Sequence, residues 1–501
     1  MTSVVSRFGL LLLAATLFAV GGKAWGQIDG GPTGMVSLRI TVQEFDPAAP
    51  WNKKPERMVQ GNALVVEGGR LLTTANMVKN ATLIEVRKFG RYPNYPARAV
   101  LVDYELDLAI LKVDARGFWE GLKPLPLAGK PIAAGRFGIM RWRANGRFEQ
   151  GSGEVVELRV ATSRFGNLEF PELRGTTAMS SLGKGEVLTS GGKVVGLVTS
   201  QSKTSLNATN SPLLRLFITA AQQQPYRGFA QRGFVWQKLD HAALRQYYGL
   251  QDNSPGVLIR RVLAGGTGSG QLRKGDILLK LGEHVIDPEG HIFHPLYGPI
   301  LFSIAINETL DPFIPAEVLR GGQRRILQLE RKLFSSADYR VHPYLFDKPI
   351  DFEVFGGLIL QELSTVYLRM WGKGWRVEAP MRLVIESLLN SLREQGGKPE
   401  KVVIISKILP DPVNLGYDDV ANTILVKANG KSLTSLNDFR RAALTPPNGF
   451  HVLELNPGKG RGWMVFKASE IDAANRRVRQ RYGVPQLREK MTARNRAIIA
   501  H

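Results

Sequence analysis

The sequence predicts a mainly β protein whose front half is built of short strands and is followed by two units of mixed α/β type. Short apolar runs punctuated by Gly, Asn and Pro follow one another from residue 35 to residue 220, which is typical of a barrel or two-sheet architecture. After residue 232 such runs alternate with helical periodicities. With 501 residues, the chain is also longer than a single hydrophobic core usually serves.

The front half, residues 35–220, contains few helical periodicities. Its predicted strands are 35–43, 62–66, 71–74, 83–87, 99–102, 108–113, 154–161 and 194–199. Ser211-Pro212 then opens a short apolar segment that ends near residue 221, and the polar stretch 222–232 reads as a linker. We therefore expect one β domain that ends close to residue 220.

Two further units are expected at residues 232–333 and 350–470, separated by a polar passage. The second contains an amphipathic helix over 381–394, with Leu383 and Leu388 on its apolar side. Residues 471–501 form a basic C-terminal tail, which we expect to be helical in part.

Residues 1–26 read as a signal peptide. Arg7 precedes the apolar run 8–20, and Ala24-Trp25-Gly26 supplies small residues for cleavage. A short membrane anchor is the alternative, although a bilayer span needs roughly 20 apolar residues. We expect a soluble, exported protein that is periplasmic or otherwise extracytoplasmic.

Composition narrows the chemistry further. The chain has no cysteine, which excludes disulfides, thiol catalysis and thiolate metal sites. Its net charge of +22 favours anionic partners such as an anionic envelope surface. The basic residues are scattered, however, and no basic motif interleaved with aromatic residues appears, so we expect no specific nucleic-acid partner.

Two segments carry a family resemblance. They are GNALVVEGGRLLTTANMV at 61–78 and LDLAILKV at 106–113. Both resemble the HtrA/Deg family of trypsin-like serine proteases, in particular its plant-type members, which implies a trypsin-like double β-barrel. In that family the first segment ends at the catalytic histidine, where this chain has Met77, and the second contains the catalytic aspartate, where it has Asp107. Counting back from the strand that follows the nucleophile loop puts Gly183 in the serine position.

The absence of a base does not depend on that alignment. The seven histidines lie at positions 241, 284, 291, 294, 342, 451 and 501, so the predicted barrel domain has none. A hydroxyl is a poor nucleophile at neutral pH unless a neighbouring base takes its proton. Loss of the serine or histidine of such a triad costs about a million-fold in turnover. The resemblance therefore implies a degenerate protease frame without an intact catalytic site, and the chain as a whole is more plausibly not an enzyme.

An unconventional serine protease is the rival hypothesis. Ser180 or Ser181 could act with Lys184, because unprotonated lysine serves as a base in some variant proteases. Such a role requires burial of the lysine.

The two C-terminal units share a strand–turn–strand pattern, with LRKGDIL at 272–278 in the first and NTILVKANG at 422–430 in the second. This pattern resembles PDZ domains, which bind extended peptides by adding them to a sheet edge. The resemblance implies two peptide-binding loops. The first consists of Gly233, Phe234, Val235 and Trp236, and the second of Phe355, Gly356, Gly357 and Leu358. Trp236 stands where glycine is common, and the second loop fits the pattern better.

His284, Asp287, Glu289, His291 and His294 lie within eleven residues and include a His-x-x-His spacing that could hold a metal ion. In the plant-type relatives the corresponding stretch is a long PDZ loop. We therefore expect neither a metal site nor a cofactor.

Together these observations favour an exported, non-catalytic HtrA/Deg-like protein that acts in protein quality control as a peptide-binding scaffold, chaperone or assembly partner. Expected partners are peptides or unfolded segments, with the chain forming a homo-oligomer or pairing with an active relative. The alternatives are a weak or unconventional serine endopeptidase and a basic adaptor tethered to an anionic envelope surface.

Overall fold

A computed structural model of the chain describes residues 33–251, 254–333, 336–388, 400–456 and 461–485. The predicted signal peptide and the end of the basic tail lie outside these residues. Within them, no helix combines the length and the apolar character that crossing a bilayer requires.

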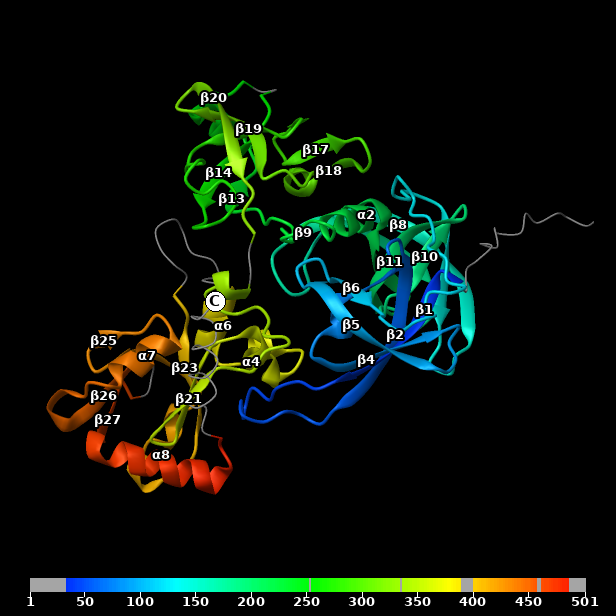
Figure 1. Ribbon diagram of the computed structural model, residues 1–501. Helices are drawn as coiled ribbons and strands as arrows, with labels where there is room; N and C mark the ends of the chain where they lie inside the picture. The colour runs from blue at the N-terminus through cyan, green and yellow to red at the C-terminus, as the bar shows by residue number, and fades with distance from the viewer. Residues whose placement is uncertain (1–32, 252–253, 334–335, 389–399, 457–460, 486–501) are drawn as a thin grey trace, which may run out of the picture.

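The front half consists of two closed six-stranded barrels (Figure 1). The first barrel has the order β1-β2-β3-β6-β5-β4 and the second β10-β11-β12-β9-β8-β7. The strands are β1 (Met35–Val42), β2 (Arg57–Val66), β3 (Arg70–Thr73), β4 (Ala81–Lys88), β5 (Asn94–Asp103), β6 (Leu108–Lys112), β7 (Arg136–Trp142), β8 (Phe148–Thr162), β9 (Glu169–Thr177), β10 (Val187–Ser190), β11 (Lys193–Ser202) and β12 (Ser205–Asn210). The mainly β class and the double barrel are thus confirmed.

Alternation along the strands explains how each barrel closes. In β1, Val36, Leu38 and Ile40 point into the core of the first barrel, whereas Met35 joins a separate core between the barrels. The predicted helix after residue 210 is α2 (Ser211–Ala220), which begins where the Asn210 side chain accepts a hydrogen bond from the Leu213 N–H. Its apolar face covers the core between the barrels.

The first C-terminal unit is a sheet of order β13-β14-β15-β19-β20 with an added hairpin. Its strands are β13 (Phe234–Gln237), β14 (Val257–Val262), β15 (Ile277–Leu281), β16 (His284–Val285), β17 (His291–His294), β18 (Gly298–Leu301), β19 (Phe313–Arg320) and β20 (Gln323–Glu330). A six-residue helix, α3 (Ala242–Tyr247), follows β13, and the 3-10 helix η2 (Phe302–Asn307) follows β18. Strand β13 forms one edge of this sheet.

The second C-terminal unit has the order β21-β22-β23-β24-β26-β27. Its strands are β21 (Phe352–Phe355), β22 (Leu358–Glu362), β23 (Val403–Ile408), β24 (Thr423–Ala428), β25 (Lys431–Ser432), β26 (Phe450–Leu455) and β27 (Trp463–Lys467). Its α-helices are α4 (Thr365–Leu368), α5 (Trp375–Glu378), α6 (Met381–Leu388), α7 (Leu436–Ala442) and α8 (Ala468–Tyr482). The predicted helix over 381–394 begins at Met381, and its last residues lie outside the described part. Helix α8 contains the start of the predicted basic tail.

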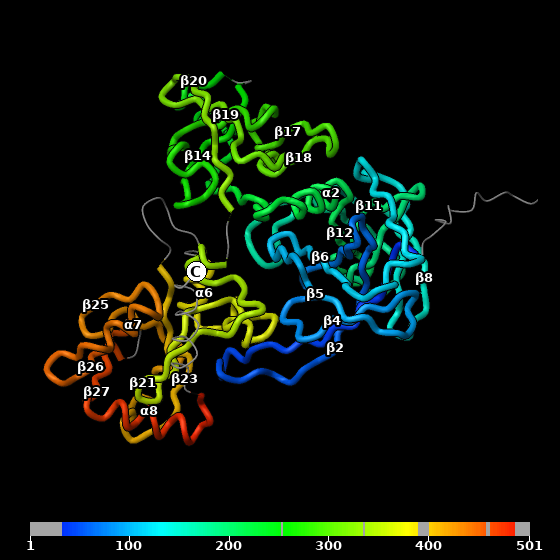
Figure 2. Tube along the Cα trace, viewed as in Figure 1, coloured from blue at the N-terminus to red at the C-terminus, as the bar shows by residue number. Residues whose placement is uncertain are grey.

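The second unit lies against the first barrel (Figure 2). The loop between β1 and β2 reaches β21 and β22, where the Gln361 side chain donates a hydrogen bond of 3.0 Å to the Pro47 carbonyl. The rings of Trp51 and Phe352 are 5.7 Å apart between centroids at the same contact. The unit is therefore held on the barrel by both polar and aromatic contacts.

Candidate functional site

Met77 lies on the four-residue helix α1 (Ala75–Val78), between the two barrels' loops. Its side chain is buried and packs against Gly61. A Cβ added to Gly61 would lie only 2.7 Å from the Met77 Cε atom. The same imagined Cβ would lie 2.6 Å from the Lys184 carbonyl oxygen. The thioether thus fills the space between strand β2 and the loop that contains Gly183.

Asp107 is brought next to Met77 by the backbone. Its Oδ1 atom accepts a hydrogen bond of 2.6 Å from the Asn76 N–H, and its own φ of +56° is left-handed. The carboxyl group is buried. Burial raises the pKa of Asp107 to about 7, although the Asn76 hydrogen bond and the charges of Arg164 and Lys79 act in the opposite direction.

Gly183, in the predicted nucleophile position, has a φ of +97°, which side chains rarely tolerate. A Cβ at this position would lie 2.9 Å from the Ser200 Cα. The loop is therefore shaped for glycine, and a serine there would require the backbone to move.

Glu186 occupies the inside of this loop. Its Oε2 atom accepts hydrogen bonds from the N–H groups of Gly183, at 2.9 Å, and Lys184, at 2.8 Å. The residue is 1% exposed, and burial raises its pKa while these N–H donors lower it. In serine proteases of this fold the N–H of the nucleophile residue is an oxyanion-hole donor. Here the Gly183 N–H, at the predicted nucleophile position, donates to the Glu186 side chain of the protein itself.

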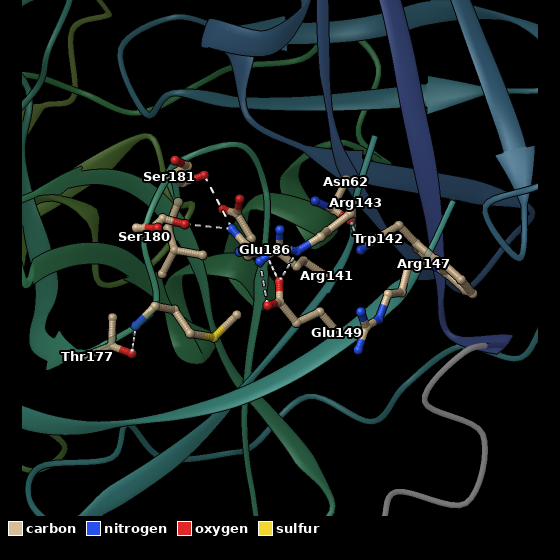
Figure 3. Close-up of polar contacts among 12 residues, drawn as sticks. Asn62, Arg141, Trp142, Arg143, Arg147, Glu149, Thr177, Ser180, Ser181 and Glu186 are labelled. Atoms are coloured by element: carbon tan, nitrogen blue, oxygen red, sulfur yellow. Dashed lines mark hydrogen bonds and ion pairs between the residues drawn. The ribbon is translucent and has the colours of Figure 1, made fainter. Parts of the chain in front are cut away.

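Arg141, at the end of β7, fixes the other side of the loop (Figure 3). Its guanidinium donates to the Glu149 Oε2 atom at 2.5 Å and to the Ser180 carbonyl at 2.8 Å. Ser181 has a left-handed φ of +61°. Lys184 is exposed, unlike Glu186.

A cavity of about 350 Å³ opens beside Asp107. Arg164, Ser200 and the ion pair of Arg159 with Glu172, 2.9 Å long, also line it. Glu105 borders the same cavity, and burial raises its pKa to about 8. The cavity beside Asp107 is thus lined by charges of both signs.

The first predicted peptide-binding loop, residues 233–236, runs into the edge strand β13. The guanidinium of Arg232, just before it, forms a 3.0 Å ion pair with Glu169 and donates to the Phe234 carbonyl. Trp236 lies against Gly290 and makes an edge-to-face contact with Phe302. Strand β13 pairs only with β14 in the sheet order of the described residues.

The second predicted loop, residues 355–358, is the tight turn of the hairpin formed by β21 and β22. Strand β22 pairs with β21 on one side and with β23 on the other. The Phe355 ring, 5% exposed, is packed by Phe439 of α7 and by Phe466. The Gly356 N–H donates to the Asn475 Oδ1 atom of α8 at 2.8 Å.

The histidine cluster separates into two groups. His284 and His294 meet at Glu308, with Nε2–oxygen distances of 2.8 and 3.3 Å. The Leu296 N–H donates to His294 Nδ1, so in the neutral ring the proton is on Nε2, which faces Glu308. That Nε2 therefore has no lone pair for a metal ion, and the group works as a hydrogen-bond network.

The other members of the predicted cluster lie elsewhere. The Asp287 Oδ1 atom accepts hydrogen bonds from the backbone N–H groups of Glu289 and His291, and the Glu289 carboxylate is 3.5 Å from Lys238. The structure thus brings His284 and His294 together at Glu308 and holds Asp287 and His291 together in a separate group.

Sequence reasoning did not single out Glu186, Arg141 or Glu308. Glu186 stands directly before the buried strand β10, and a charged residue in that place was the available signal. Arg141 and Glu308 have no such signal, because the fold brings Arg141 to the Ser180 carbonyl, 39 residues away, and Glu308 to His284, 24 residues away.

Comparison with known proteins gives three findings. A family model described as "PDZ domain" matches residues 341–490. The chain is 27% identical over 395 residues to "Putative protease Do-like 3, mitochondrial" of Arabidopsis thaliana, covering 77% of this chain and 67% of the relative. It is 24% identical over 469 residues to "Protease Do-like 2, chloroplastic" of the same plant, covering 91% and 74%.

A solved structure, "HtrA-type protease AlgW with decapeptide", aligns with a TM-score of 0.45 at 19% identity and covers 62% of this chain and 98% of that one. By sequence the chain is thus similar to Do-like proteases over most of its length, and its C-terminal part, residues 341–490, matches a PDZ domain.

Proposed function

We propose that this chain is an exported, non-catalytic HtrA/Deg-like protein that holds peptides or unfolded segments as a scaffold, chaperone or assembly partner in protein quality control. The observation that carries the proposal is the Glu186 carboxylate bound to the Gly183 and Lys184 N–H groups. Met77 and Gly183, which stand where the sequence predicts the family's histidine and serine positions, add to it.

Acyl transfer in this fold needs a nucleophile, a base and donors for the oxyanion. At the three positions this chain offers a glycine, a thioether and an N–H already bonded to a carboxylate. The negative charge of the Glu186 carboxylate would repel the negative charge of an oxyanion. An incoming oxyanion would have to displace Glu186, which is 1% exposed and held by two N–H groups. Each of these features opposes peptide cleavage.

A dyad of Ser180 or Ser181 with Lys184 is the enzymatic alternative. A lysine becomes a base when burial disfavours its charged form, and Lys184 is exposed. The backbone carbonyls of Ser180 and Ser181 accept hydrogen bonds from Arg141, which holds this loop in place. The local geometry therefore favours the non-catalytic proposal.

Peptide binding is proposed for the edge of β13 in the first PDZ-like unit. A peptide adds as a strand only where a strand has an unpaired edge. Strand β13 has one neighbour in its sheet, whereas β22 has two. In the second unit β21 runs antiparallel to β22 and ends at the glycine turn, so it takes the place of a peptide beside α7. The predicted role of residues 355–358 in binding an external peptide would require β21 to leave.

Catalysis is tested with a fluorophosphonate probe and with fluorescent casein. We expect no labelling and no cleavage above the level of a Ser180→Ala/Ser181→Ala double variant. Labelling of the wild-type protein that the double variant abolishes would establish the enzymatic alternative.

Peptide addition to β13 is tested from the ligand side, with peptides released from unfolded casein as probes. A peptide found to bind is resynthesised with N-methyl groups at alternate residues, which removes every second N–H donor. One of the two alternating patterns should abolish binding, and the other, a matched control, should retain it. Equal loss with both patterns, or with neither, would contradict strand addition.

A further inference from the structure

Two turns from different barrels meet at a point that the sequence did not single out. A Cβ on Gly90, in the turn between β4 and β5, would lie 2.5 Å from the carbonyl oxygen of Gly146, in the turn between β7 and β8. The turns therefore touch backbone to backbone. Trp142 packs against this contact, since the same imagined Cβ would lie 2.8 Å from its ring. Trp142 is itself held in place by its N–H, which donates to the Asn62 side chain at 2.6 Å, and by its indole N–H, which donates to the Met35 carbonyl at 3.1 Å.

A hollow of about 730 Å³ lies between these turns, and we call it the Tyr92 hollow. Half of the residues that line it are aromatic: Phe89, Tyr92, Tyr95, Trp142 and Phe148. Tyr92 is 88% exposed, while the Trp142 ring is buried and packs on Phe148 at 4.9 Å between centroids. The hollow is thus lined by apolar rings, and the Tyr92 ring is open to solvent.

All charged residues that line the hollow are cationic: Lys88, Arg91 and Arg147. The Lys88 ammonium donates to the carbonyls of Gly117 and Glu120. Arg91 and Arg147 are exposed, and no ion pair to a carboxylate is found for either within the described residues. Figure 3 shows Arg147 near Glu149, whose carboxylate forms ion pairs with Arg141 and Arg143.

We propose that the Tyr92 hollow binds a short acidic peptide segment in which an aromatic or large apolar side chain stands between carboxylates. Apolar walls accept the large side chain, and guanidinium groups at the rim pair with the carboxylates. A single-stranded nucleic acid is less suited, since such sites track a backbone over several nucleotides with successive stacked bases. The volume falls in the range of roughly 300–1,000 Å³ that is typical of small-ligand pockets.

The hollow is separate from the β13 edge, so this proposal does not depend on the proposed function. It adjoins a second hollow of about 340 Å³ through Trp142, which lines both. Ser180, Ser181 and Lys184 line that second hollow. A peptide bound at Tyr92 could therefore continue toward the loop of Gly183.

The test uses fluorescence anisotropy with a fluorescein-labelled Asp-Glu-Phe-Asp-Glu peptide and the full chain. Arg91→Glu/Arg147→Glu should raise the Kd at least tenfold, and Tyr92→Ser should raise it several-fold. Arg260→Glu/Arg273→Glu reverses two exposed arginines of the first PDZ-like unit and is the matched control, expected to change the Kd less than twofold. All these side chains are exposed, so the melting temperatures should stay close to that of the wild-type protein.

Three outcomes would overturn the proposal. One is equal loss of binding in the two double variants, which would show that only the net charge of the protein, and not the Tyr92 hollow, affects peptide binding. Another is unchanged binding of a peptide with Ser in place of Phe. The third is tighter binding of a labelled oligo-dT than of the peptide, weakened by the Arg91/Arg147 variant alone, which would assign the hollow to nucleic acid.

Discussion

Asn80 and Asp347 exchange two hydrogen bonds although 267 residues of chain separate them. The Asn80 N–H donates to the Asp347 Oδ1 atom at 2.6 Å, and the Asp347 N–H donates to the Asn80 Oδ1 atom at 2.9 Å. The Tyr104 hydroxyl donates to the second oxygen of Asp347, and its ring lies 4.9 Å from that of Phe346. The segment between the two PDZ-like units is therefore bound to the first barrel at Asn80, which follows Met77 by three residues.

Asp347→Ala should loosen this fastening. It removes two hydrogen bonds made by one carboxylate, each worth about 1–3 kcal/mol when a charged group takes part. We expect trypsin to cleave the chain faster after Arg340 and Lys348 and the radius of gyration to grow in small-angle scattering. Asp311→Ala, which removes another exposed carboxylate, should change neither.

Asp107→Asn should change how stability depends on pH. Burial raises the folded-state pKa to about 7 from 3.8, so the folded protein holds this proton more tightly than the unfolded chain does. Stability from this group is therefore full below about pH 4 and falls as the pH rises to 7. Asparagine does not titrate, so the free energy of unfolding of the variant should rise relative to that of the wild type between pH 4 and 7, by at most about 4 kcal/mol.

Urea unfolding of both proteins at pH 4, 5.5, 7 and 8 measures this gain. Asp240→Asn, at an exposed carboxylate, is the control and should show no such trend. A constant difference between Asp107→Asn and the wild type at all four values would contradict a buried, titrating carboxyl group.

Phe355→Ala should detach β21 from the second PDZ-like unit. The ring is buried against Phe439, His451 and Phe466, and truncating such a phenylalanine costs about 3–5 kcal/mol. Hydrogen exchange should then rise in β21 and along the edge of β22. Val465→Ala, which shortens a side chain 45% exposed on β27, should leave exchange at both strands unchanged.

The barrels could be predicted because the sequence patterns that indicate their strands lie within short segments. Strands such as β1 alternate apolar and polar residues, and the segments 61–78 and 106–113 carry a recognisable pattern. Glu186 could not be assigned its role, since its burial depends on the fold of its own loop, and the charge that acts on it comes from Arg141, 45 residues earlier in the chain. Likewise, the predicted loop 355–358 does not reveal which strand lies beside β22. The pairing of β21 with β22 decides whether the second unit has a free groove, and that pairing is a tertiary property.

Met77→His/Gly183→Ser, which rebuilds the family's base and nucleophile, should not react with a fluorophosphonate probe. The new serine would have a φ near +97° with its Cβ 2.9 Å from the Ser200 Cα, and the Glu186 carboxylate would still hold the N–H of residue 183. Left-handed strain of this kind costs about 1–3 kcal/mol, so a lower melting temperature is also expected. Adding Glu186→Ala frees the N–H, and any reactivity should appear only in that triple variant. Equal labelling of the double and triple variants would show that Glu186 is no obstacle to an oxyanion.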